Sequence, residues 1–184
     1  MFNGEVLFNG SNTAGNAGLW VTDGTAAGTH EITGISGAFD GGGNPAAAGV
    51  DPRDLTVFNG EVLFEGINSA YQTGLWVTDG TAAGTHEITV SGASTAGIFG
   101  GANDSGAALL PDLTPFSGKV LFVARGADQR VGLWTTDGTT AGTHEITTFA
   151  GAIGGLTVFN KEVLFTGPDR GVWVTDGTAS GPMN

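Results

Sequence analysis

Three kinds of polar residue recur at fixed spacing along this 184-residue chain and could carry chemistry. An aspartate followed by Gly and Thr occurs four times, at Asp23, Asp79, Asp137 and Asp176. Seven positions after the first three of these stands a histidine, followed directly by a glutamate, at His30, His86 and His144. Carboxylates and imidazoles can bind a metal ion, exchange protons or fix the backbone by hydrogen bonds.

The aspartates are predicted to fix turns. Each opens a Gly-Thr turn between two β-prone segments, where its carboxylate can accept hydrogen bonds from backbone N–H groups two or three residues on. Calcium is the functional alternative, with Thr hydroxyls and loop carbonyls as further ligands. Calcium takes about six to eight oxygens, usually with several carboxylates, and each turn offers one. The structural role is therefore preferred, with ligand binding by Asp23, Asp79 and Asp137 as the alternative.

The three histidines are expected to be partly buried and hydrogen-bonded to the preceding turn. Neighbouring strand residues point to opposite faces, so a His-Glu pair cannot chelate one metal ion. No second histidine lies within helical or strand spacing of any of them, which argues against a zinc motif. The alternative is a row of rim histidines that binds a ligand or makes assembly depend on pH.

The four tryptophans are predicted to pack in the core, although exposed indoles could stack on sugar rings. Each stands in mid-strand between Leu or Val and Val or Thr, a position that favours packing between sheets: Trp20, Trp76, Trp134 and Trp173.

No catalytic constellation is apparent. The chain contains neither a Gly-x-Ser-x-Gly elbow nor a phosphate-binding Gly-x-x-x-x-Gly-Lys loop. Its most informative residues are the same in every copy, whereas an active site needs different residues converging in one place. We expect a protein that is not an enzyme. The enzymatic alternative would need Asp40, Asp51, Asp104 or Arg125 to converge.

The elements that position these residues belong to a unit that occurs four times. The segment 18–25 returns at 74–81, 132–139 and 171–178, and a Phe-initiated segment at 2–8 returns from residues 58, 116 and 159. The second copy predicts strands at 54–58, 61–64, 75–78 and 85–89. Asn59-Gly60 predicts a two-residue type I′ hairpin, whose two central residues both need positive φ.

Strands 61–64 and 75–78 are apolar at successive positions, which predicts sheets buried on both faces. We expect an all-β fold, a β-propeller of four-stranded antiparallel meander blades, with a β-solenoid as the alternative. One repeat domain spans 1–184, with copies at about 1–50, 51–109, 110–152 and 153–184. The first copy lacks its first strand and the last copy its last strand. The unpaired edges predict a homo-oligomer.

Two Gly/Ala-rich connections are long, at residues 34–53 and 90–111, and each contains one aromatic residue, Phe39 or Phe99. Long surface loops commonly carry binding residues. Their low charge favours flexible spacers instead.

Composition narrows the range of partners. The net charge is −12, with only six Lys and Arg residues, so nucleic acid and anionic membranes are poor partners. No apolar run approaches the length of a membrane span, so we expect no membrane insertion. Cysteine is absent, which excludes disulfides and thiolate metal sites. Because Met1 leads directly into repeat sequence, we expect no export leader in this chain.

The segment 19–29, Leu-Trp-Val-Thr-Asp-Gly-Thr-Ala-Ala-Gly-Thr, resembles the bacterial "ELWxxDGT" repeat, also labelled hyalin-like. Gly18, Gly74 and Gly132 stand where that family has Glu. The resemblance implies an extracellular or cell-surface bacterial protein, in some members with calcium-binding repeats elsewhere, and implies no catalytic residues. We therefore expect a binding or structural module, carbohydrate-binding or adhesive, without a required cofactor. A purely architectural, self-assembling role is the alternative.

Overall fold

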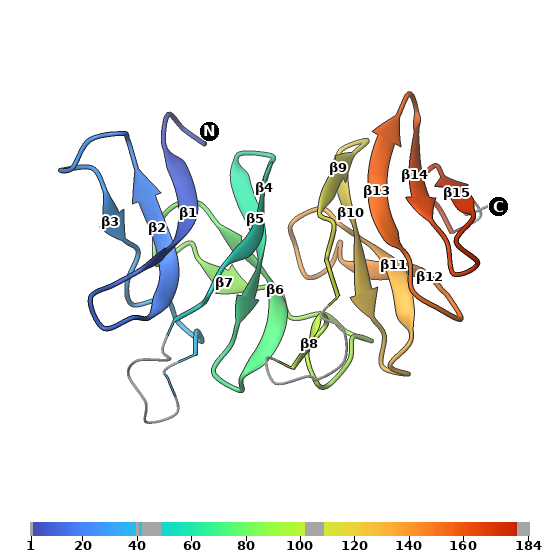
Figure 1. Ribbon diagram of the computed structural model, residues 1–184, viewed down its shortest axis with the longest axis horizontal. Coiled ribbons are helices and arrows are strands. Elements are labelled where there is room, and N and C mark those ends of the chain that lie inside the picture. Colours follow the sequence, from blue (N-terminus) through green and yellow to red (C-terminus); the bar gives the residue numbers. More distant parts are fainter. Residues whose placement is uncertain (1, 40, 42–48, 102–108, 180–184) are drawn as a thin grey trace. The chain divides into compact units, whose positions relative to one another are not determined.

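The computed structural model describes residues 2–39, 41, 49–101 and 109–179, and in them the protein is all-β. Its strands form four antiparallel sheets, two in each of two compact units, and each unit is described by itself (Figure 1). No helix in these residues is long and apolar enough to cross a membrane.

The first unit comprises Met1–Ile88 with Gly101–Asn103. Its first sheet has the order β1-β2-β3, and its second has the order β4-β5-β6-β7. The strands are β1 (Val6–Ser11), β2 (Ala17–Thr22), β3 (His30–Glu31), β4 (Arg53–Phe58), β5 (Glu61–Ile67), β6 (Gln72–Thr78) and β7 (His86–Glu87).

The second unit comprises Thr89–Gly100 with Asp104–Asn184, and the two-residue β8 (Gly100–Gly101) lies where the chain passes between the units. Its sheets have the orders β12-β11-β10-β9 and β13-β14-β15. The strands are β9 (Thr114–Phe116), β10 (Lys119–Arg125), β11 (Val131–Thr136), β12 (His144–Thr148), β13 (Gly154–Phe159), β14 (Glu162–Thr166) and β15 (Val172–Thr175).

The hairpin that opens the second copy has the predicted geometry. Asn59 and Gly60, between β4 and β5, have φ values of 50° and 80°, as a type I′ turn requires. Before β1 the described residues contain one antiparallel bridge, between Phe2 and Glu5, in place of a first strand. The last sheet is described as far as residue 179, and the position of a further strand at 180–184 lies outside the described residues.

In each unit the two sheets stand face to face around an apolar core (Figure 1). In the first unit, Leu19 and Val21 of β2 pack with Phe64 of β5 and Trp76 of β6. In the second, Leu121, Val123 and Leu133 pack with Phe165, and Trp173 borders the cluster. Phe64 and Trp76 have no exposed surface. Burial of both faces of the inner strands is the reason why their apolar residues are consecutive.

The long Gly/Ala connections are ordered parts of the fold where they are described. Ala38 forms an antiparallel bridge with Asn68, and the Gly37 carbonyl accepts a hydrogen bond from Ser69 N at 2.7 Å. The second connection forms an equivalent bridge between Ala93 and Gly126. Phe39 packs against Tyr71 in a tilted arrangement, with ring centroids 4.6 Å apart. The described parts therefore pack on the loop of a following hairpin and are not simple spacers.

Candidate functional site

All four aspartate turns contain the predicted hydrogen bond. In the first copy Asp23 Oδ1 accepts a bond from Thr25 N at 2.8 Å and another from Thr25 Oγ1 at 2.7 Å. The same two bonds form at the other aspartates, Asp79, Asp137 and Asp176. The hydroxyl and backbone donors of the Thr lower the pKa of each carboxyl. One oxygen of each carboxylate is therefore engaged in shaping its own turn.

The three histidines are exposed, not partly buried as the sequence suggested. Each pairs with the residue after the tryptophan of the neighbouring strand, as His30 does with Val21. Because strand residues alternate, the following glutamate points to the opposite, tryptophan-bearing face. The three histidines lie on three different sheets, one on each.

The glutamates after the histidines, which sequence reasoning set aside, are the polar groups that turn inward. Both Glu31 carboxylate oxygens accept bonds from Asn12 Nδ2, at 3.4 and 3.2 Å. Glu87 accepts the same pair of bonds from Asn68, both at 3.1 Å. A side chain at Gly18 would overlap the Glu31 carboxylate. Gly18 was thus a signal, available in the sequence, that the strand must leave room for a half-buried carboxylate.

The third copy lacks the asparagine. Gly126 occupies the position of Asn68, forming the same loop hydrogen bond from its N–H to the carbonyl four residues on. Glu145 Oε1 is buried without a partner in the described residues. Burial and, secondly, the nearby Asp128 charge raise the pKa of Glu145. Burial also raises the pKa of Glu87, which its bond from Asn68 opposes. Equivalent glutamates therefore have different surroundings in different copies.

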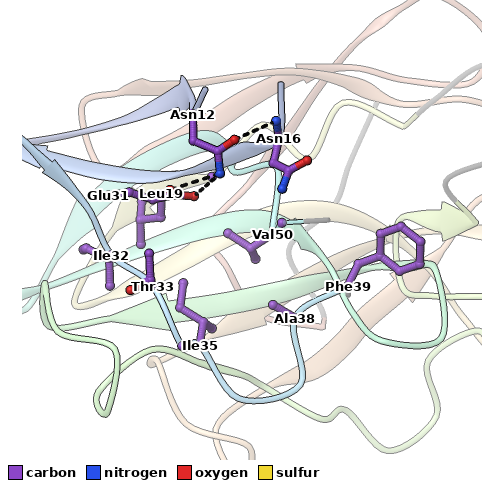
Figure 2. A pocket seen from close by; sticks show the side chains of 13 residues that line it. Asn12, Asn16, Leu19, Glu31, Ile32, Thr33, Ile35, Ala38, Phe39 and Val50 are labelled. Carbon is purple, nitrogen blue, oxygen red and sulfur yellow. Dashed lines mark hydrogen bonds between the residues drawn. The ribbon is translucent and has the colours of Figure 1, made fainter. Parts of the chain in front are cut away.

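The first unit contains a pocket of about 360 Å³ beside Glu31 (Figure 2). One wall is polar and is formed by Asn12, Asn16 and Glu31, which Figure 2 shows together at one side. Ile32, Thr33 and the Gly/Ala connection form the rest, with Phe39 at the end away from Glu31. The described parts of the first connection thus supply an apolar floor opposite a carboxylate and two amides.

Asn16 is the polar side chain of this wall that has an unused group. The side-chain oxygen of Asn12 accepts bonds from the backbone N–H groups of Ala14 and Asn16, at 3.0 and 3.1 Å, which fixes the Asn12 amide towards Glu31. Asn16 Oδ1 is buried and has no hydrogen-bond partner in the described residues. Leaving this buried acceptor without a hydrogen bond costs the folded state free energy.

None of the candidate ligand-binding residues predicted from the sequence, the turn aspartates and the three histidines, lines this pocket. Trp76 and Trp134 are buried in the core, as predicted, at 0% and 1% exposure, and Trp20 and Trp173 are half-buried. In the described residues no group of three or more His, Cys, Asp or Glu side chains is placed to hold a metal ion.

Glu65, on β5, is a second inward carboxylate, with 8% of its surface exposed. Burial raises its pKa to about 7; Arg53, its partner in register on β4, acts in the opposite direction. Asp51 and Asp54 raise the pKa further. The folded protein therefore holds this proton more tightly than the unfolded chain, whose carboxyl has a pKa of 4.5.

Folding stability should consequently fall as the pH rises from about 4.5 to about 7, because the unfolded state releases the Glu65 proton first. Glu65→Gln removes this loss. The free energy of unfolding of the variant, relative to that of the wild type, should rise by about 2 kcal/mol from pH 4.5 to pH 8. Urea unfolding of both proteins at the two pH values measures the difference. An identical difference at both would contradict the buried, protonated carboxyl.

Comparison of the chain with family models, curated protein sequences and solved structures found no significant match.

Proposed function

We propose that this protein is a non-enzymatic binding module whose pocket beside Glu31 takes a neutral sugar. The observation that carries the proposal is the polar wall of that pocket, where a carboxylate and two amides face an apolar floor. Carboxylates and side-chain amides are suited to sugar hydroxyls, since they offer acceptors and donors close together. Apolar side chains can contact the C–H surface of the same sugar ring.

Size and charge narrow the ligand class. A volume of about 360 Å³ is at the lower end of small-molecule pockets, which suits a mono- or disaccharide. Glu31 and a net charge of −12 disfavour uronic acids and other anionic sugars. The carboxylate and amide groups that line the pocket suit a ligand with hydroxyl or amide donors. Neutral hexoses and N-acetylated hexoses supply such donors.

The proposed setting is extracellular, on or outside a bacterial cell, where the module would serve adhesion. The resemblance of residues 19–29 to the ELWxxDGT repeat supports this placement. We further propose that the four sheets are blades of a β-propeller, which the face-to-face packing inside each unit supports. An architectural, self-assembling role is the second candidate, favoured by exposed apolar residues on the first and last sheets.

The test is a glycan array of neutral and acidic mono- to tetrasaccharides, followed by calorimetry on the best neutral binder. Wild-type protein should bind a neutral glycan, and Glu31→Gln should weaken binding at least tenfold, since a charged acceptor is lost. Binding should be the same with calcium and with a chelator.

Glu87→Gln is the matched control, because Glu87 has the same asparagine contact in the next copy but does not line the pocket. It should bind like the wild type. No binding on the array, or equal losses for the two variants, would refute the pocket as a sugar site.

A further inference from the structure

The packing between sheets follows one rule in both units. The leucine-bearing face of the earlier sheet covers the Phe/Trp-bearing face of the later sheet. In the first unit Leu19 and Val21 cover Phe64 and Trp76. In the second, Leu121 and Leu133 belong to the cluster that contains Phe165, with Trp173 packed against it.

A second contact accompanies each covered face. The phenylalanine before the first hairpin turn of the earlier sheet rests on the Gly of the aspartate turn in the later sheet. In the first unit Phe2 Cε1 lies 3.5 Å from the position that a Cβ would take at Gly80. In the second unit Phe116 lies 3.6 Å from the corresponding position at Gly177. The ring and the side-chain-free turn fit together at both places.

The last sheet has a leucine-type face that is exposed. Val172 of β15 corresponds to Leu19 in the repeat, but it is 70% exposed whereas Leu19 is fully buried. Phe159, at the end of β13, corresponds to Phe2 and is 58% exposed whereas Phe2 is 4% exposed. The register of β13, β14 and β15 places both side chains on the same face.

The first sheet has the complementary face, also uncovered. Phe8 and Trp20 are directly opposite each other on β1 and β2, as Phe64 and Trp76 are on β5 and β6. They are half-buried, and Val6 on the same face is 44% exposed. No atom of the described residues lies within 4 Å of the position that a Cβ would take at Gly24, the turn glycine of this sheet.

We propose that the last sheet of one molecule docks on the first sheet of a second copy of this chain. Phe159 then rests on Gly24, and Val172 covers Phe8 and Trp20, repeating the contacts seen inside each unit. The two surfaces differ, so the contact is head-to-tail and each molecule can engage two neighbours, forming a ring or a filament. This inference rests on the sheet packing and not on the sugar pocket.

A second molecule of this chain is the expected partner, because the chain carries both surfaces of the contact: the exposed face of its last sheet and the exposed face of its first sheet. The Phe-on-Gly fit recurs in two sheet pairs, and a partner with an unrelated surface would have to reproduce it together with the apolar face. Phe159 and Val172, 58% and 70% exposed on one face of the last sheet, are apolar side chains of the kind that mark an interaction surface.

Light scattering after size exclusion tests the proposal, with Phe159→Asp, Val158→Asp and Val6→Asp. Val158 is the matched control: it adjoins Phe159, is 45% exposed and points to the opposite face. Wild type and Val158→Asp should show masses that are multiples of 18.4 kDa and rise with concentration. Phe159→Asp and Val6→Asp should each remain monomeric, because each lacks one half of the contact.

The decisive sample is an equimolar mixture of Phe159→Asp and Val6→Asp. Each retains the half that the other has lost, so the mixture should form a complex of twice the 18.4 kDa chain mass and no larger. Circular dichroism confirms that the variants are folded, and Val172→Asp replaces Phe159→Asp if that variant is not. A monomeric wild type at every concentration, an undiminished mass for Phe159→Asp, or a mixture that stays monomeric would each overturn the proposal.

Discussion

Replacing Trp76 with alanine should lower the free energy of unfolding by about 3–5 kcal/mol, the cost of removing a large aromatic side chain from a packed core. Trp76 has no exposed surface and contacts Phe64, with ring centroids 6.3 Å apart. It also packs in the cluster that joins the two sheets of the first unit. Chemical denaturation followed by circular dichroism measures the loss.

Trp20→Ala is the matched comparison, because Trp20 occupies the same repeat position and has the same type of Phe partner, at 6.3 Å. It is half-buried, so the loss should be smaller, about 1–3 kcal/mol. Both variants are best measured in dilute protein, where docking between molecules does not add to the burial of Trp20. Equal losses of unfolding free energy for the two variants would mean that the faces bearing Trp20 and Trp76 are equally covered, which would contradict the structure.

Gly84→Ala should destabilise the protein by about 2–4 kcal/mol, an effect far above that of an ordinary surface substitution. Gly84 has no positive φ, so the requirement is for space. A Cβ there would overlap the Asp79 carboxylate. Relief of that overlap would break the bonds from Thr81 N and Oγ1 to Asp79, 2.9 and 2.7 Å long. Thermal and urea unfolding report the change.

A double-mutant cycle with Asp79→Ala separates this mechanism from a general intolerance of the turn. Removing the carboxylate removes the overlap, so Gly84→Ala should cost little more once Asp79→Ala is present. Additive losses for the two substitutions would mean that the alanine methyl group acts on something other than the carboxylate.

Local features of this fold could be predicted from the sequence wherever one residue type dictates one geometry. Asn59-Gly60 predicted a hairpin with two positive φ values, and both are present. The aspartate before Gly and Thr predicted a carboxylate bonded to the backbone two residues on, which forms in all four copies. Consecutive apolar residues predicted strands buried on both faces, as in β5 and β6.

The candidate site could not be predicted in this way, because its residues come from three segments far apart in sequence. Asn12 and Asn16 flank the turn between β1 and β2, Glu31 ends β3, and Val50 precedes β4. Only folding brings them to one pocket. The histidines are candidate ligands by residue type. Because successive side chains of a strand point to opposite faces, the histidines point outward and the adjacent glutamates inward. Gly18 was the overlooked signal, since its missing side chain makes room for Glu31.

The most direct test of a sugar site beside Glu31 is an NMR titration of backbone amides with the neutral glycan that binds best on the array. A sugar bound in this pocket should cause saturable shifts at Gly18, Thr33 and Gly49, which line it. Gly74 and Gly132, which hold the same repeat position as Gly18 in other copies, should shift little. Equal shifts at all three glycines, or shifts that leave Gly18, Thr33 and Gly49 unmoved, would contradict a sugar site beside Glu31.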